Sequence, residues 1–137
     1  MFQGFISTGD ARAPGNLGLK DQVIAMRFVK NHIEKFGGDP NSITISGDSA
    51  GSWSVILHML SPMSKGLFHG GIAMSGGPLT SLSLPYDQKD LLLKQAKFLG
   101  CPSQDINEIF ECFKSKDTKA FVDSRGKFAV NLMRFIY

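Results

Sequence analysis

Short apolar segments alternate with helical segments along the first half of the 137-residue chain. Strands are expected at residues 2–7, 42–46 and 71–74, each bounded by turn-forming residues. Helices are expected between them, at residues 19–36 and 50–60, where apolar side chains recur every three or four positions. Because strands that alternate with helices favour right-handed crossovers, the sequence predicts an α/β fold: a parallel sheet with helices on both faces.

The second half of the chain is helical in character. Beyond Pro85, apolar residues at helical spacing predict helices at residues 91–99 and 106–113, and a third at 118–122. No repeat or low-complexity linker separates the two halves. We therefore expect one domain over residues 1–137, made of an α/β segment (about 1–80) and a helical segment (about 81–137).

The charge pattern argues against a nucleic-acid or membrane function. Fifteen Lys and Arg face twelve Asp and Glu, a net charge of +3. The densest basic group, Lys114, Lys116 and Lys119, is broken by Asp117 and forms no stripe that could follow phosphates. No apolar run is long enough to span a bilayer, and the first ten residues lack the charged and apolar regions of a signal peptide. The protein is expected either to stay inside the cell or to lack its true N-terminus here.

Gly47-x-Ser49-x-Gly51 matches the nucleophile-elbow pattern, in which a serine occupies a sharp turn between a strand and a helix. A turn this tight is expected to leave no room for a Cβ atom on either glycine. The backbone N–H of Ala50, at the start of the helix, could donate to the oxyanion of a tetrahedral intermediate. Since a strand and a helix are expected on independent grounds, Ser49 is a candidate nucleophile.

A structural alternative remains open at this point. Glycine and serine are common in this chain, so a Gly-x-Ser-x-Gly pattern can also arise by chance. A glycine-rich turn followed by a serine that caps a helix would carry the same pattern.

The residues that follow the elbow supply no catalytic triad. In this type of site an acid and then a histidine follow the serine. Only His58 and His69 follow Ser49, and residues 50–69 contain no Asp or Glu, so the order cannot be assembled within these residues. We expect both histidines to be structural, and we expect Asp48 to point away from the site and make a structural hydrogen bond.

Six short motifs follow one another along the first part of the chain: Ala13-Pro14-Gly15-Asn16-Leu17-Gly18-Leu19-Lys20-Asp21-Gln22, Phe36-Gly37-Gly38-Asp39-Pro40-Asn41, Gly47-Asp48-Ser49-Ala50-Gly51, Leu60-Ser61-Pro62, Gly66-Leu67-Phe68-His69 and Ser75-Gly76. In their order and spacing they resemble the type B carboxylesterase and cholinesterase family, and in overall character the chain is similar to the insect-type esterases. The resemblance covers about residues 1–80 closely.

The resemblance implies an α/β-hydrolase fold, with Ser49 as nucleophile and Ala50 as an oxyanion-hole donor. It also implies that Leu79 and Leu82 shape the pocket for the acyl group, that the substrate is a small ester, and that neither a cofactor nor a metal is used.

The two cysteines, Cys101 and Cys112, lack the paired spacing of a zinc site, and their number leaves the redox compartment open. The resemblance implies that they form a family disulfide, which points to the secretory pathway for the parent enzyme. Two free buried thiols are the alternative.

The chain also departs from the family pattern. Asp48 replaces a usual Glu, Met74 a usual Gln, and Ser52 and Trp53 stand where small residues are common. The upstream oxyanion loop and the downstream acid and histidine are missing, so the chain is expected to be an internal segment. We expect the full-length enzyme to be a serine carboxylic-ester hydrolase, and we expect this segment to be inactive by itself. The alternative is a catalytically inactive adhesion or binding module of the same fold.

Overall fold

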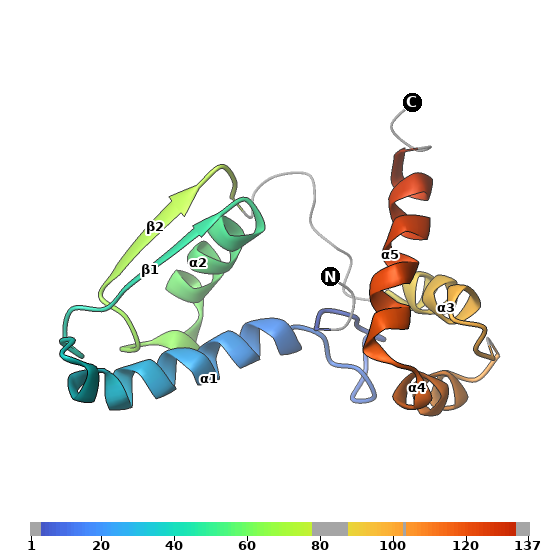
Figure 1. Ribbon diagram of the computed structural model, residues 1–137, viewed down its shortest axis with the longest axis horizontal. Helices are drawn as coiled ribbons and strands as arrows, with labels where there is room; N and C mark the ends of the chain where they lie inside the picture. The colour runs from blue at the N-terminus through green and yellow to red at the C-terminus, as the bar shows by residue number, and fades with distance from the viewer. Residues whose placement is uncertain (1–3, 78–87, 103, 134–137) are drawn as a thin grey trace. The chain divides into compact units, whose positions relative to one another are not determined.

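The computed structural model describes residues 4–77, 88–102 and 104–133. The chain divides into two compact units, Met1–Tyr86 and Asp87–Tyr137. The first unit contains the sheet and the second is helical (Figure 1). Each unit is described by itself.

The sheet of the first unit has two parallel strands, β1 (Thr44–Asp48) and β2 (Gly70–Met74). Their register pairs Thr44 with Gly70 and Asp48 with Met74. The connection between them runs through the helix α2 (Ala50–Leu60) and a short 3-10 helix, η2 (Pro62–Ser64). This βαβ unit confirms the expected α/β class, since parallel neighbours require a crossover of this kind.

Helix α2 packs along one face of the sheet. A Cβ atom placed on Gly71 would lie 3.1 Å from Cγ1 of Val55, a buried residue of α2. Burial alternates along β1, as expected for a strand with one covered face. On β2, Ile72 and Met74 are 53% and 47% exposed. Their register partners Ser46 and Asp48 are exposed too, so within the described residues this second face is largely uncovered.

The helix expected at residues 19–36 is found as α1 (Leu17–His32) continued by the 3-10 helix η1 (Ile33–Phe36). It ends at Gly37, whose φ of 82° lies in the left-handed region that glycine adopts without steric cost. Val23 is the buried residue of α1.

The strand expected at residues 2–7 is wrong over its described part. Ser7 makes one isolated antiparallel bridge with Pro14, and the Thr8 N–H donates to the Ala13 carbonyl over 3.0 Å. The chain turns back on itself here instead of joining a sheet. Although the composition of this segment favours a strand, among the described residues it pairs with no neighbouring strand. Within the turn, hydrogen bonds from Arg12 and Thr8 hold the pKa of Asp10 well below its usual range.

The second unit contains α3 (Lys89–Phe98), α4 (Ile106–Ser115) and α5 (Thr118–Met133). All three were expected, but α5 extends far beyond residue 122. Two contacts hold the first half of α5 against the other helices. The Gln95 side chain of α3 donates to the hydroxyl of Ser124 over 2.8 Å, and the rings of Phe113 and Phe121 pack edge to face 5.3 Å apart. Tertiary contacts of this kind stabilise a helix that its own propensities leave marginal.

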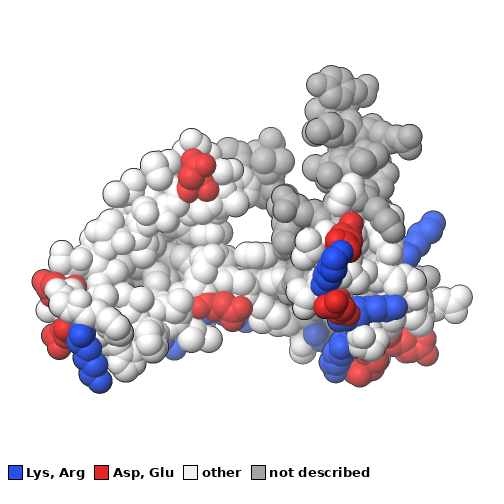
Figure 2. Space-filling model, viewed as in Figure 1, with Lys and Arg blue, Asp and Glu red and all other residues white. Residues whose placement is uncertain are grey.

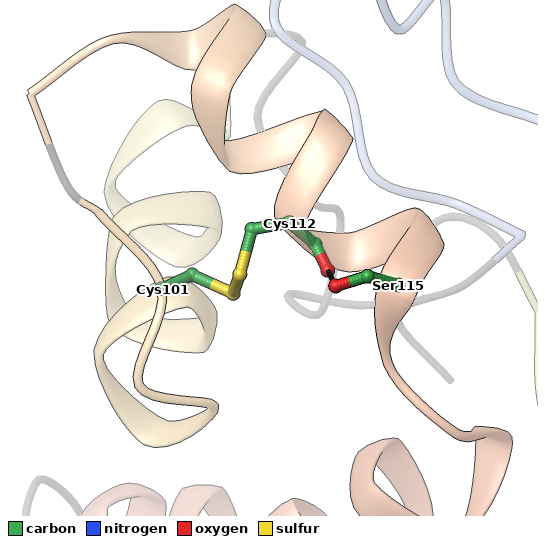
Figure 3. Close-up of a disulfide and its surroundings, with 3 residues drawn as sticks. All are labelled: Cys101, Cys112 and Ser115. Carbon is green, nitrogen blue, oxygen red and sulfur yellow. Dashed lines mark hydrogen bonds between the residues drawn. A yellow bond between two sulfur atoms is a disulfide. The ribbon is translucent and has the colours of Figure 1, made fainter.

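Cys101 and Cys112 form a disulfide that joins the segment after α3 to α4 (Figure 3). Their Cα atoms are 5.9 Å apart, and the Ser115 hydroxyl donates to the Cys112 carbonyl over 2.7 Å. The disulfide expected from the family resemblance is confirmed, and the alternative of two free thiols is wrong.

Charged residues are distributed unevenly. On the face shown in Figure 2, blue and red atoms mix over the helical unit, while the region of β1, α2 and β2 is almost entirely white. Residues 43–63 and 70–77 contain two ionisable side chains, Asp48 and His58. No helix within the described ranges is long and apolar enough to cross a bilayer.

Removing the disulfide should destabilise the helical unit. For a loop with a sequence separation of 11, the chain-entropy account gives about 3 kcal/mol. We expect the variant with Cys101→Ser and Cys112→Ser to unfold at a lower denaturant concentration than the oxidised wild type. Reduction of the wild type should reproduce that shift and leave the variant unchanged; equal midpoints for the oxidised wild type and the variant would contradict the prediction.

Candidate active site

The candidate nucleophile lies at the junction of β1 and α2. β1 ends at Asp48 and α2 begins at Ala50, so Ser49 alone makes the turn. Its backbone angles, φ 52° and ψ −113°, lie outside the regions that non-glycine residues prefer. A conformation of this kind costs about 1–3 kcal/mol and persists only where the surroundings fix it.

Backbone hydrogen bonds fix both sides of this residue. The Ser49 N–H donates to the carbonyl of Met74, the last residue of β2, over 2.9 Å. The Ser49 carbonyl accepts from the N–H of Trp53 in α2, over 3.2 Å. The turn is therefore held by the neighbouring strand on one side and by the helix on the other.

The side chain of Ser49 is exposed and makes no capping hydrogen bond to the start of α2. A capping serine would have extended backbone angles and an occupied hydroxyl. The structural alternative, a capping serine in a glycine-rich turn, is therefore wrong for this residue. The hydroxyl is presented at the carboxyl end of β1, outside the helix.

The two glycines of the motif differ in their surroundings. A Cβ atom on Gly47 would lie 2.3 Å from the backbone carbon and oxygen of Gly51, closer than any real contact. Apart from its chain neighbours and the backbone of its own helix, a Cβ atom on Gly51 would meet no atom of the described residues within 4 Å. The steric reason expected for both glycines therefore holds for Gly47 and is wrong for Gly51 as far as the described residues extend.

Ala50 is the first residue of α2 and is exposed. N–H groups in the first turn of a helix have no acceptor within the helix and lie at the positive end of its dipole. The N–H of Ala50, the residue that follows Ser49, is therefore suited to an anionic oxygen.

His58 lies about 14 Å from Ser49 along α2, at 1.5 Å per residue. It is 5% exposed. A neutral imidazole satisfies both of its contacts, because Nε2 can donate to Oε1 of Gln22 while Nδ1 accepts from the Ser64 hydroxyl, each over 2.8 Å. Burial lowers the pKa of His58 below its ordinary 6.5. These contacts join α1, α2 and η2, as a structural histidine would.

His69 lies at the opposite end of the strands from Ser49. Its Nδ1 accepts from the Ile43 N–H over 3.2 Å, and its own N–H donates to the Ile43 carbonyl over 2.7 Å. Ile43 and Ser49 are six residue steps apart along an extended strand, a distance of about 20 Å. His58 and His69 are thus both held by structural contacts, and neither is brought to the hydroxyl of Ser49.

The remaining predicted residues are only partly placed. Asp48 is exposed, on the sheet face opposite α2, and within the described ranges it makes no hydrogen bond of the kind expected for it. Leu79 and Leu82 lie outside the described residues. Among the residues that are described, no group of three or more His, Cys, Asp or Glu side chains could hold a metal ion.

One contact was missed from the sequence. The Ser52 hydroxyl donates to the carbonyl of Gly76, just after β2, over 2.6 Å. In the sequence, Ser52 stands out only as a larger residue at a position where the family commonly has small ones. In the sequence, Gly76 marks only a turn after the strand. Because Ser52 and Gly76 are 24 positions apart, the sequence does not show that they form a hydrogen bond.

Comparison with a family model and comparison with individual proteins point to the same family. The sequence model of the carboxylesterase family matches residues 2–136. The chain is 48% identical over 121 residues to esterase FE4 of Myzus persicae, and 44% over 124 residues to a carboxylic ester hydrolase of Bombus ignitus. It is 43% identical over 129 residues to a juvenile hormone esterase of Tribolium castaneum. These alignments cover 88%, 90% and 91% of the chain, and each covers 22% of the relative.

The chain therefore belongs to the carboxylesterase family, and its βαβ unit is part of an α/β-hydrolase fold. It spans about a fifth of the length of these curated relatives.

The asymmetry of the two glycines gives a paired test. Gly47→Ala should destabilise the protein by about 1–3 kcal/mol or more, because its Cβ must displace the backbone of α2. Gly51→Ala should be neutral or stabilising by up to about 1 kcal/mol, since alanine is favoured over glycine in a helix. Denaturant titration of both variants measures the difference. Equal midpoints for the two variants would contradict this account.

His58 should make stability depend on pH. Its folded pKa is lowered, so the unfolded state binds the proton more readily. The free energy of unfolding is therefore expected to keep the His58 contribution above about pH 6.5 and to lose it as the pH falls through the lowered folded pKa. Denaturant unfolding between about pH 7.5 and about pH 5 should show a smaller slope for His58→Asn than for the wild type. Identical slopes would rule out this role.

Proposed function

We propose that this chain carries the nucleophile of a serine carboxylic-ester hydrolase. The observation that carries the proposal is the conformation of Ser49: a strained turn between a parallel strand and a helix, with its hydroxyl free of any cap. Membership of the carboxylesterase family supports the same reading.

In the proposed reaction, Oγ of Ser49 attacks the ester carbonyl and its proton passes to a general base. The Ala50 N–H donates to the oxyanion of the tetrahedral intermediate. The base returns the proton to the alcohol as it leaves, so that the acyl group stays on Ser49. Water activated by the same base then attacks the acyl-enzyme, which releases the carboxylic acid and restores the serine. This sequence needs neither a cofactor nor a metal.

The base and its acid are proposed to lie outside these 137 residues. His58 and His69 are engaged elsewhere, and the chain spans about a fifth of its relatives. A serine without its base is a weak nucleophile, so the 137 residues by themselves should not turn over esters.

The substrate class follows from the family and from the names of relatives, one of which is a juvenile hormone esterase. We propose a small carboxylic ester, with Leu79 and Leu82 lining the pocket for its acyl group. The disulfide supports an oxidising compartment, so the parent enzyme is proposed to be secreted or to reside in the secretory pathway. No basic stripe favours a nucleic-acid partner.

A fluorophosphonate probe tests the proposal on the full-length protein. Peptide mapping should find the probe on Ser49. Ser49→Ala should abolish labelling and lower kcat for a p-nitrophenyl ester by about a thousandfold or more. Ser54→Ala, which removes a hydroxyl of the same helix bonded to the Ala50 carbonyl, is the matched control and should leave labelling intact. A full-length protein that folds but is not labelled at Ser49 would instead fit a catalytically inactive binding module.

A further inference from the structure

Ser52 is a buried polar residue whose hydroxyl makes a hydrogen bond to a distant part of the chain. It lies in the first turn of α2, three residues after Ser49, and its side chain is completely buried, at 0% exposure. Its hydroxyl donates to the carbonyl of Gly76 over 2.6 Å. A buried hydroxyl is costly unless it is bonded, so this contact fixes where the acceptor segment must lie.

The acceptor segment is also the one that holds Ser49. Gly76 comes two residues after Met74, whose carbonyl accepts from the Ser49 N–H. Between them, Ser75 has a φ of 59°, so it too is held in the left-handed region. Among the described residues three non-glycine residues have positive φ, and two of them, Ser49 and Ser75, lie on the two sides of this contact.

The turn after β2 also packs closely against α2. A Cβ atom on Gly76 would lie 3.0 Å from Nε1 of Trp53 and 3.3 Å from the carbonyl oxygen of Ser49. There is thus little room for the turn to move toward the helix, and the Ser52 hydrogen bond opposes movement away from it.

We infer that Ser52 is a positioning residue for the nucleophile, an inference that rests on the proposed esterase function. Two strained residues persist only where the surroundings over-determine them. The bonds from Ser49 to Met74 and from Trp53 to Ser49 are backbone bonds that any residue type could make. The Ser52 hydroxyl adds a side-chain restraint: it holds the Ser75–Gly76 turn on α2, which keeps the Met74 carbonyl opposite the Ser49 N–H.

The test compares Ser52→Ala with Ser54→Ala in the full-length protein. Both remove one hydroxyl from α2, but the Ser54 hydroxyl donates to Ala50 within the same helix. Hydrolysis of p-nitrophenyl acetate is normalised to the sites titrated by a fluorophosphonate, so that unfolded protein does not contribute. Ser52→Ala should lower kcat per titrated site by about tenfold, the effect of one lost hydrogen bond, while KM changes by less than about twofold. Ser54→Ala should match the wild type.

A second variant covers a failure of Ser52→Ala to fold. Ser52→Cys keeps the shape of the side chain with a larger sulfur atom and donates only weakly, so it should also lower kcat per titrated site. The inference is overturned if the folded Ser52 variants, per titrated site, react within about twofold of the wild type and lose only thermal stability. A wild type that is not labelled at Ser49 overturns the proposed function itself, and this result is distinct from labelled variants with an unchanged rate.

Discussion

The close approach of two backbones at the junction of β1 and α2 is the constraint on which the first unit depends. Gly47 and Gly51 come so near that a single Cβ on Gly47 would overlap the first turn of the helix. That approach brings α2 directly behind the end of the strand, and Ser49 must make the connection alone, in a conformation that residues with a side chain rarely adopt. With these backbone angles Ser49 is exposed, and its hydroxyl makes no capping hydrogen bond to α2.

Much of this arrangement was predictable from the sequence. The helix at Ala50–Leu60 was expected with its observed bounds, and β1 and β2 within two residues of theirs, because β-branched and apolar segments ended at clear turn signals. The strand expected at residues 2–7 is wrong over its described residues 4–7, because a strand needs a partner strand and composition does not show whether one is present. The length expected for α5 is too short. The contact of Gln95 with Ser124 that supports this helix joins positions far apart in the sequence, which the local pattern does not show.

Only those parts of the candidate site that are contiguous in the sequence could be predicted from it. Ser49 and Ala50 could be found because the motif, the strand and the helix are contiguous in sequence. Ser52 could not, since its role depends on a carbonyl 24 residues away, brought near by the parallel crossover. The role assigned to Gly51 was too general: the two glycines look equivalent in the motif, but only the direction of a Cβ atom in three dimensions separates them.

The scarcity of charge around β1, α2 and β2 sets the character of the chemistry available there. Asp48 lies on the sheet face opposite α2 and His58 lies near the far end of that helix, while the start of α2 places peptide N–H groups without a helical acceptor directly after Ser49. Dipoles of the backbone do not titrate, although dissolved salt screens their effect at a helix terminus. The contribution that the Ala50 N–H would make to an oxyanion at this turn therefore does not itself change with pH.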